Sequence, residues 1–378
     1  MKIVFAPDKF KMCMKSATVC RVMQKAFRTV FPDAELVSVP VSDGGEGMTR
    51  ALAAALHGEI HTVRVTGPDG NPVEAEFALI NNGLTAVFEM ASASGLYLVN
   101  PIKRNPMTAT TYGTGEVIRA ILDLGVRDIL IGLGGSATVD GGAGMAQALG
   151  YNLLDPRGRE LPLGGGALHM LSRIAIAGAD PRLSETRITT ACDVRNPLSG
   201  PFGAAQVYGP QKGATPDMVA QLDHNLRHLF TVWERHSMLL PKEMPGDGAA
   251  GGLGAGLRAF CGAQPKSGAE LILDAISFRN QIADADLVVT GEGRTDAQTA
   301  EGKLCCAVAQ AAHRNGIPVL LLSGAVEGTP EELGKTYDFV FSTSTGRRTL
   351  DEAMAAAADD LYFTAVNAAR LFCHGTTP

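Results

Sequence analysis

The fold is decided by the stretch DILIGLGGSATVDGGAGMAQALG, which occupies residues 128–150. It opens with a short apolar, β-branched run at 129–131, which predicts a buried strand. It closes with good helix formers at 145–149, and the glycine that follows is a common end of a helix. Between these elements lie six glycines and one acid, Asp140. A strand, a glycine-rich turn and a helix start are typical of a phosphate site, because glycine lets backbone N–H groups approach the anion.

Two other interpretations of this stretch stay open. Its first half, Gly132 to Ala137, fits the G-x-G-x-x-A variant of the dinucleotide-binding fingerprint, which would indicate a nicotinamide-dependent dehydrogenase. That function also needs an acid about 20 residues further on, at the end of a second strand. Asp155 lies near that distance but within a Pro-Gly turn. A tight turn without any ligand is the other interpretation, although one turn needs far fewer glycines.

Length and composition bound the class of protein. The chain has 378 residues, enough for two domains. Its net charge of −6 and pI near 5.8 argue against a nucleic-acid partner, which would require a basic stripe. No apolar run approaches the ~20 residues that span a bilayer, and the segment MKIVFAPDKF resembles a first strand more than a signal peptide. We therefore expect a cytoplasmic protein with no membrane partner; its oligomeric state stays open, a homo-oligomer being one option.

The order of elements predicts an α/β fold with two domains. Strands alternate with helices in both terminal thirds, which is typical of parallel sheets, and the middle carries hairpins at 63–80 and 151–161. We expect residues 1–75 with 285–378 to form a doubly wound parallel sheet, and residues 76–284 to form an inserted mixed α/β domain. Residues 200–213 are expected to form a loop, and a strand at 287–290 is expected to end before GEGRTD.

Acidic residues follow the predicted strands, where ligands of open α/β sheets bind. These acids are Asp8, Asp43, Glu89, Asp140, Asp193 and Glu292. They suit Mg²⁺ held against phosphates, since this ion takes one or two carboxylates together with phosphate oxygens and water. Cations in the same regions could neutralise a phosphate or a carboxylate: Lys9, Lys11, Arg195, Lys212, Arg294 and Lys303. A phosphate cradle, a metal, a cation and a base are the parts that phosphoryl transfer needs. A further basic pair, Lys103-Arg104, follows a loop of small residues.

Taken together, these strings resemble the class I glycerate kinases, of the glycerate 2-kinase type. Besides the stretch 128–150, the motifs that carry the resemblance are IVFAPD at 3–8, PVSDGGEG at 40–47, VTGPDG at 65–70, EMASASGL at 89–96, KRNP at 103–106, GTGE at 113–116, ACDVRNPLSGPFGA at 191–204, YGPQKGA at 208–214, GAAGG at 248–252 and VVTGEGRTDAQTAEGK at 288–303. The resemblance implies ATP-dependent phosphorylation of D-glycerate to 2-phosphoglycerate with Mg²⁺. It also implies that one of the two α/β domains is flavodoxin-like, with the active site in the cleft between them.

The predicted site follows from the motifs and the resemblance together. Asp193 is expected to be the catalytic base, with Asp8 as the second choice, and Lys11 and Arg294 are expected to assist catalysis. Substrate binding is assigned to Asp43, Gly44, Gly45, Glu46, Arg195, Asn196 and Lys212. Nucleotide binding is assigned to Gly134, Gly135, Ser136, Asp140, Gly141, Gly142, Gly291, Glu292 and Gly293. The metal ligand is expected among Asp43, Asp140 and Asp193.

Three departures from the family pattern motivate alternative functions. The family usually has serine where this chain has Lys9, asparagine where it has Val139, and G-K-x-P-x-G where it has GKLCCA at 302–307. The first adds a positive charge beside Asp8, and the others remove a polar side chain, a proline and a glycine. The alternatives are a kinase of another small hydroxy acid, or a catalytically impaired relative that still binds nucleotide or acid.

Overall fold

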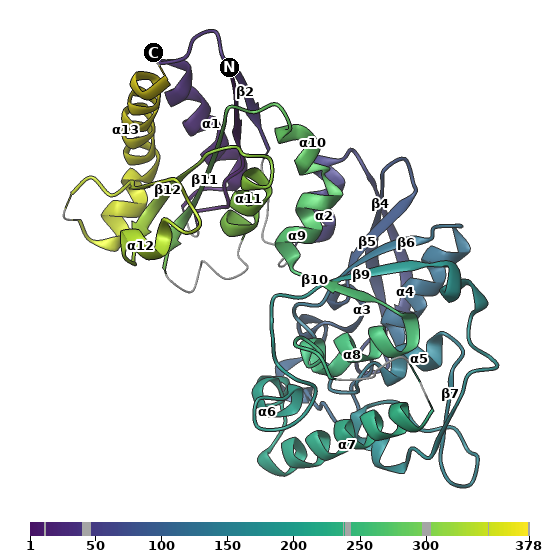
Figure 1. The fold of residues 1–378 in the computed structure, drawn as a ribbon. Helices are drawn as coiled ribbons and strands as arrows, with labels where there is room; N and C mark the ends of the chain where they lie inside the picture. Colours follow the sequence, from purple (N-terminus) through teal and green to yellow (C-terminus); the bar gives the residue numbers. More distant parts are fainter. Residues whose placement is uncertain are drawn as a thin grey trace. The chain divides into compact units, whose positions relative to one another are not determined.

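The computed structural model describes residues 1–10, 13–39, 47–236, 238, 243–296, 304–346 and 348–376. The chain divides into two compact units (Figure 1). Unit 1 combines Met1–Asp43 with Ile272–Pro378, and unit 2 is the continuous segment Gly44–Leu271. The domain boundaries that the sequence suggested, near 75 and 285, stay predictions. Among the described residues, no helix is long and apolar enough to cross a membrane.

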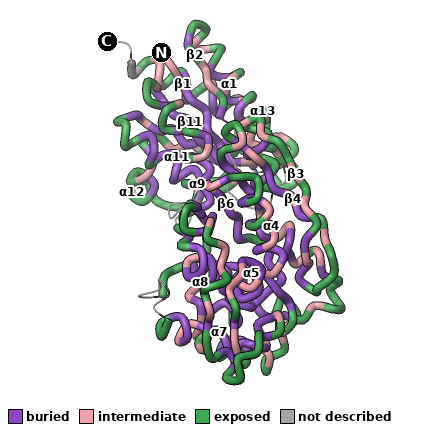
Figure 2. The backbone as a smooth tube through the Cα atoms, turned by 90° about the vertical axis from the view of Figure 1, so that its right-hand side faces the viewer, coloured by how far each residue is buried: buried purple, intermediate pink, exposed green. Residues whose placement is uncertain are grey.

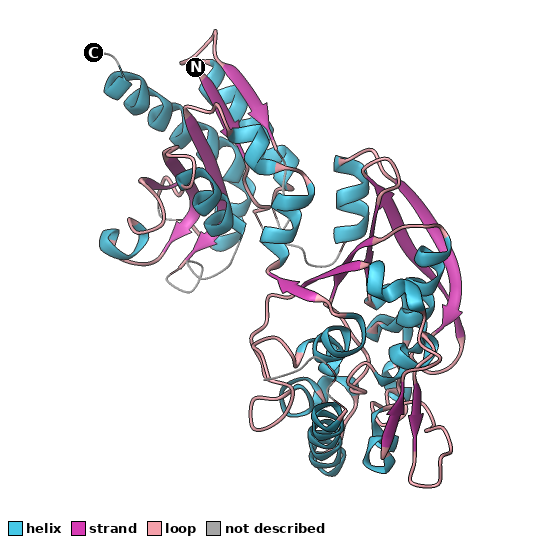
Figure 3. Ribbon diagram, turned by 45° about the vertical axis from the view of Figure 1, so that its right-hand side comes forward, coloured by secondary structure: helices cyan, strands magenta, loops and turns pink. Residues whose placement is uncertain are grey.

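Unit 1 is built on a five-stranded parallel sheet in the order β2-β1-β11-β12-β13. Numbered along unit 1 alone, this is the order 2-1-3-4-5 of flavodoxin-like folds, so the predicted doubly wound parallel sheet is confirmed. Helices lie on both faces of these strands (Figure 3). The strands are β1 (Lys2–Phe5), β2 (Glu35–Ser38), β11 (Leu287–Thr295), β12 (Val319–Val326) and β13 (Phe339–Ser342). The helices are α1 (Ser16–Arg28), α10 (Phe278–Ile282), α11 (Leu304–His313), α12 (Pro330–Leu333) and α13 (Leu350–Thr376), while α9 (Gly268–Ala275) crosses the boundary between the units.

The core of unit 1 forms where α1 and α13 pack on the sheet. Helix α1 buries Val19, Met23 and Phe27, which recur at the spacing of one helical face. They share a core cluster with Leu361 of α13 and with apolar residues of β1, β11 and β12. Helix α13 begins with the predicted capping box, in which Thr349 N donates to Glu352 Oε2 (2.9 Å).

Unit 2 is built on a six-stranded mixed sheet in the order β10-β9-β6-β5-β4-β3. The first four strands of this order are parallel, and β3 and β4 form the predicted antiparallel hairpin at one edge. The strands are β3 (Glu59–Thr66), β4 (Pro72–Ile80), β5 (Thr85–Glu89), β6 (Asp128–Gly132), β9 (Arg187–Ala191) and β10 (Gln264–Lys266), with β7 (Asn152–Leu154) and β8 (Arg173–Ala175) paired separately. The helices are α2 (Met48–Ala55), α3 (Ala91–Ser94), α4 (Tyr112–Asp123), α5 (Ala143–Ala148), α6 (Ala204–Tyr208), α7 (Pro216–Arg235) and α8 (Ala249–Cys261), with 3₁₀ turns η1 (Leu96–Leu98), η2 (Pro101–Lys103), η3 (Gly165–Met170), η4 (Pro181–Glu185) and η5 (Pro210–Lys212).

Two local predictions in unit 2 need correction. A turn does form at 155–158, but β7 forms its ladder with β8 at 173–175, and only a single bridge, Leu154–Glu160, spans the turn. The segment 200–213 contains α6 and η5 and is not an open loop. Its alanines pack against the unit 2 core, which favours a helical turn over the extended loop that its glycines and prolines suggested.

The core of unit 2 is separate from that of unit 1 and surrounds the only tryptophan, Trp233. The Trp233 ring makes edge-to-face contact with Phe260 of α8, with 5.6 Å between ring centroids. All residues of α8 except Arg258 are buried, and the central strands of the sheet are buried as well (Figure 2). Buried strands and helices thus hold the glycine-rich stretch of unit 2 in place.

Candidate functional site

The glycine-rich stretch leaves β6 through an exposed turn at Gly134 and Gly135 and then returns into the interior. Leu96 N donates to Gly135 O (2.8 Å), and Ala137 N donates to Ser94 O (2.9 Å). Ser136 is buried and forms an isolated bridge with Gly95. The stretch therefore lies against the segment that follows α3, and the predicted strand, turn and helix are all present.

Asp140 ends this buried segment and is fully buried itself. Its Oδ2 accepts hydrogen bonds from Thr111 N (2.8 Å), Thr111 Oγ1 (2.9 Å) and Gly144 N (3.3 Å), and its Oδ1 accepts from Gly142 N (3.1 Å). Burial raises the pKa of the carboxyl, and these donors oppose that rise. Asp140 thus ties the start of α5 to the start of α4, and two glycine amides that we expected near a phosphate donate to this carboxylate.

Gly141 and Gly142 lie inside the unit 2 core. Both have positive φ, and a Cβ at Gly141 would lie 2.5 Å from Leu229 Cδ2. A Cβ at Gly142 would lie 3.1 Å from Gly256 Cα. The glycines are therefore required by close packing, and their assignment to the nucleotide stays a prediction.

Lys212 is the most unusual cation of unit 2, because only 2% of it is exposed. It ends η5, and its Nζ donates to Ser136 Oγ and to Thr138 O, both at 2.7 Å. Burial lowers the pKa of Lys212 from 10.5 to about 7, and the negative charge of Asp140 opposes that shift. The sequence assigned Lys212 to the substrate and Ser136 and Asp140 to the nucleotide, and the structure brings the three residues together.

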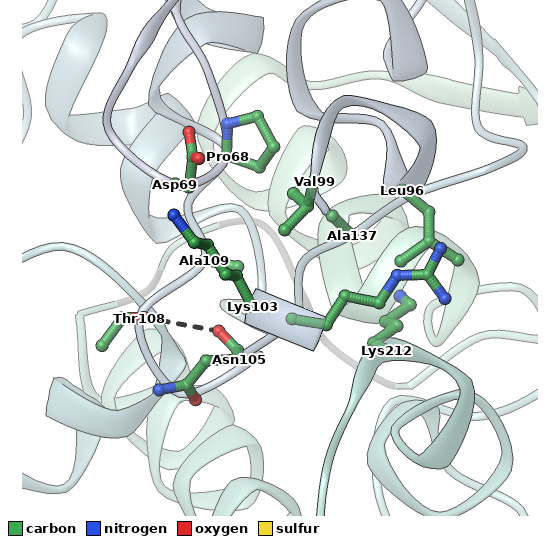
Figure 4. A pocket seen from close by; sticks show the side chains of 11 residues that line it. Pro68, Asp69, Leu96, Val99, Lys103, Asn105, Thr108, Ala109, Ala137 and Lys212 are labelled. Carbon is green, nitrogen blue, oxygen red and sulfur yellow. Dashed lines mark hydrogen bonds between the residues drawn. The ribbon is translucent and has the colours of Figure 1, made fainter. Parts of the chain in front are cut away.

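A pocket opens above Lys212, wholly within unit 2 (Figure 4). It is lined by Pro68, Asp69, Leu96, Val99, Lys103, Arg104, Asn105, Thr108, Ala109, Ala137 and Lys212. Besides Lys212, it contains two cations that were not assigned to the site from the sequence, Lys103 and Arg104. Their only sequence signal was the adjacency of two basic residues in KRNP, and nothing in that motif links them to Lys212.

Asp193, Arg195 and Asn196 follow the carboxyl end of β9, as predicted. Asp193 is exposed, and its Oδ1 accepts a hydrogen bond from Gly268 N (2.8 Å). Arg195 is also exposed. Asn196 donates to Phe202 O (2.9 Å) and accepts from Tyr208 Oη (2.7 Å), so its side chain holds the segment that leads into α6.

The predicted residues of unit 1 that the structure describes lie just after β1 and in the second half of β11. Asp8 N donates to Gly291 O (2.8 Å), and Glu292, 8% exposed, accepts from Thr295 Oγ1 (2.9 Å). These two strands flank the point at which the strand order of the sheet reverses, which is the usual ligand position in flavodoxin-like folds.

The GEGR segment at 291–294 is not the loop that the sequence predicted. It continues β11, and Gly291 pairs with Leu322 of β12. A Cβ at Gly291 would lie 2.3 Å from Leu322 O, so glycine there allows the close approach of the β12 backbone. Gly293 lies on the same strand, and Arg294 forms an exposed ion pair with Glu327 (2.7 Å).

Several predicted residues lie outside the described part of the chain: Lys11, Asp43, Gly44, Gly45 and Glu46. Within the described part, no three His, Cys, Asp or Glu side chains are placed to share a metal ion. Mg²⁺ needs only one or two protein carboxylates beside phosphates and water. Asp140 is fully buried and its oxygens accept four hydrogen bonds, whereas Asp193 is exposed; the assignment of a metal ion to either stays a prediction.

Comparison with known proteins assigns the family. A family model described as the glycerate kinase family matches residues 3–373. "Glycerate 2-kinase" of Escherichia coli (strain K12) is 47% identical over 96% of this chain and 95% of its own length. "Glycerate kinase" of Bacillus subtilis (strain 168) is 46% identical over 97% of this chain and 96% of its own. A crystal structure from Salmonella typhimurium LT2, named as a candidate glycerate kinase 2, superposes with a TM-score of 0.84 at 45% identity and covers 99% of each chain. The chain belongs to the glycerate kinase family.

Proposed function

We propose that this protein transfers a phosphoryl group from ATP to the 2-hydroxyl of D-glycerate and releases 2-phosphoglycerate and ADP. Family membership supports the class of reaction, and the E. coli relative's name supports the 2-position. The structural observation that carries the proposal is the pocket of unit 2, where three cations face a small cavity with one acid, Asp69. Such a charge balance suits a small carboxylic acid.

In this proposal, Asp193 accepts the proton of the 2-hydroxyl as that oxygen attacks the γ-phosphorus. Its position after β9 and its hydrogen bond from Gly268 N give the carboxylate a fixed anchor at the strand end. Asp8 is the second choice for the base. Mg²⁺, held by Asp43 or, where Asp8 is the base, by Asp193, would neutralise phosphate charge.

The nucleotide is assigned to two glycine-containing segments. The exposed turn at Gly134 and Gly135 can present backbone N–H groups to a phosphate, with Ser136 beside it. In unit 1, the assignment uses Gly291 to Gly293 at the reversal point of the sheet. Lys11 and Arg294 would meet the transferring phosphoryl group, and Arg195 the substrate.

The test is ADP release from Mg²⁺-ATP with D-glycerate, with the position of the phosphate determined by ³¹P NMR. We expect 2-phosphoglycerate as the product and loss of about 100-fold or more in kcat for Asp193→Asn. Asp217→Asn, which changes an exposed acid in the first turn of α7, serves as the matched control. A 3-phosphate product would refute the position, and turnover of Asp193→Asn within a few-fold of wild type would refute the base.

The departures from the family pattern bear on the choice of substrate. Val139 is fully buried in the unit 2 core, and Cys305 is buried in α11. Neither lines the pocket, which favours glycerate over a hydroxy acid of different shape. A panel of small hydroxy acids in the same assay checks this choice: faster turnover of another acid would replace glycerate as the substrate.

A further inference from the structure

Lys103 ends η2 and Arg104 follows it, and both residues line the pocket together with Lys212. In Figure 4 the Lys103 side chain extends toward Asp69, away from Lys212. We propose that Arg104 is the specificity-determining residue that binds the carboxylate of the acid substrate above Lys212. This inference rests on the proposed function, because it assigns the substrate's charged end to one place in the pocket. The carboxylate of the acid and a phosphate of the nucleotide share the same anion chemistry, and the experiment below separates them.

The guanidinium of Arg104 has one nitrogen that donates to the protein and one that is buried without a partner in the described part of the chain. Its Nη1 donates to Gln211 O (3.3 Å). Its Nε is buried and has no hydrogen-bond partner in the described part of the chain. The Nε edge is one of the two faces through which arginine binds a carboxylate with parallel hydrogen bonds. A buried donor without a partner is costly, so a ligand oxygen at this edge would satisfy it.

The turn that carries Lys212 also fixes Arg104. Gly213 follows Lys212 with φ +91°, and a Cβ there would lie 2.6 Å from the Arg104 carbonyl oxygen. The turn thus contacts Arg104 through Gln211 and Gly213, and its middle residue, Lys212, lines the pocket. The separation between the guanidinium and the ammonium is therefore set by direct backbone packing and not by a flexible linker.

Lys212 completes the anion site from below. Its ammonium donates to Ser136 Oγ and Thr138 O, which leaves one of its three protons for a ligand. Lys212 and Ala137 both line the wall of the pocket (Figure 4). Because burial lowers the Lys212 pKa to about 7, a bound anion would raise that pKa and draw in a proton.

The remaining walls suit a short carbon chain. Leu96, Val99 and Ala109 are apolar, and Thr108 adds a hydroxyl. The one acid, Asp69, accepts hydrogen bonds from Asn71 N (3.2 Å) and Asn71 Nδ2 (2.9 Å). Its charge is thus engaged in its own turn, and the pocket keeps an excess of positive charge.

The experiment compares Arg104→Gln and Arg104→Lys with the wild-type chain. Steady-state kinetics are measured with D-glycerate and with D-glyceramide, which lacks the carboxylate charge, at saturating ATP. We expect Arg104→Gln to raise KM for D-glycerate by about 10- to 100-fold, with kcat within a few-fold of wild type. Arg104→Lys keeps the positive charge but cannot form two parallel hydrogen bonds, so its KM for D-glycerate should lie between those of wild type and Arg104→Gln. Arg173→Gln removes an exposed arginine of β8 that does not line the pocket, and should leave both constants unchanged.

The outcomes separate this inference from the proposed function. Two results would refute the inference while the function stands. In the first, D-glycerate is phosphorylated but its KM does not change in Arg104→Gln. In the second, Arg104→Gln raises KM for D-glyceramide as much as for D-glycerate. If Arg104→Gln instead raises KM for ATP alone, the pocket holds a nucleotide phosphate and the carboxylate assignment is refuted. If D-glycerate is not phosphorylated, calorimetry with D-glycerate alone decides. Binding with proton uptake at pH 8 that Arg104→Gln abolishes would support the inference without the function, and no binding would refute it.

Discussion

At the scale of single residues, Asp140 is predicted to matter first for stability. Its carboxylate accepts four hydrogen bonds in a site without solvent access. Asp140→Asn would place amide N–H groups against some of these donors, so we expect a loss of about 1–3 kcal/mol in the free energy of unfolding. Urea titration followed by Trp233 fluorescence measures it, with Asp217→Asn as the exposed control. An unchanged midpoint would show that water or a shift of the turn replaces these bonds.

Lys212 is predicted to make stability depend on pH. Its pKa falls from 10.5 to about 7 on folding, so between these values the unfolded chain binds a proton that the folded chain does not. Stability contributed by this residue therefore rises with pH across that window. Lys212→Met removes this titrating group. The unfolding free energy of the variant minus that of wild type should therefore be largest near pH 7 and fall toward pH 10. A difference that is the same at pH 7, 8 and 9 would show that the Lys212 pKa is not lowered.

At the scale of elements, α8 positions Lys212 through a glycine. Gly251 has φ +70°, and a Cβ there would collide with the Thr138 carbonyl oxygen. That oxygen accepts a hydrogen bond from the Lys212 ammonium. Gly251→Ala should therefore destabilise unit 2 by more than about 1 kcal/mol and weaken D-glycerate binding. Gly262→Ala is the matched control, because it shares the left-handed φ (+64°) at the end of α8 but meets nothing within 4 Å. Equal effects of the two changes would assign the cost to backbone strain alone.

Local patterns predicted most elements, and long-range contacts account for the misses. The apolar face of α1 and the β-branched run of β6 are visible in the sequence because burial imposes their periods directly. The GEGR segment has the composition of a turn, yet its pairing with β12 keeps it extended, and that partner lies about 30 residues further along the chain. Arg104 was not recognised for a similar reason, since it meets the Lys212 turn only in the folded unit.

At the scale of the whole molecule, the main core cluster of unit 1 and that of unit 2 share no residue within the described part of the chain. Unit 1 depends on two distant segments of the sequence, and unit 2 on one continuous segment. The only tryptophan lies in the core of unit 2, so its fluorescence reports on that unit, whereas far-ultraviolet circular dichroism reports on both. Small single domains unfold in one cooperative transition, but chains with separate cores need not.

Leu361 and Leu226 allow a matched test of this independence. Each is fully buried in a helix, Leu361 in α13 of unit 1 and Leu226 in α7 of unit 2. Either change to alanine should cost its own unit about 2–5 kcal/mol, because it removes buried methyl groups and leaves a cavity. We expect Leu361→Ala to shift part of the circular dichroism transition to lower urea and leave the Trp233 midpoint unchanged. Leu226→Ala should lower the Trp233 midpoint. If Leu361→Ala lowers the Trp233 midpoint as much as Leu226→Ala does, the two cores unfold together, and the units are parts of one cooperative domain.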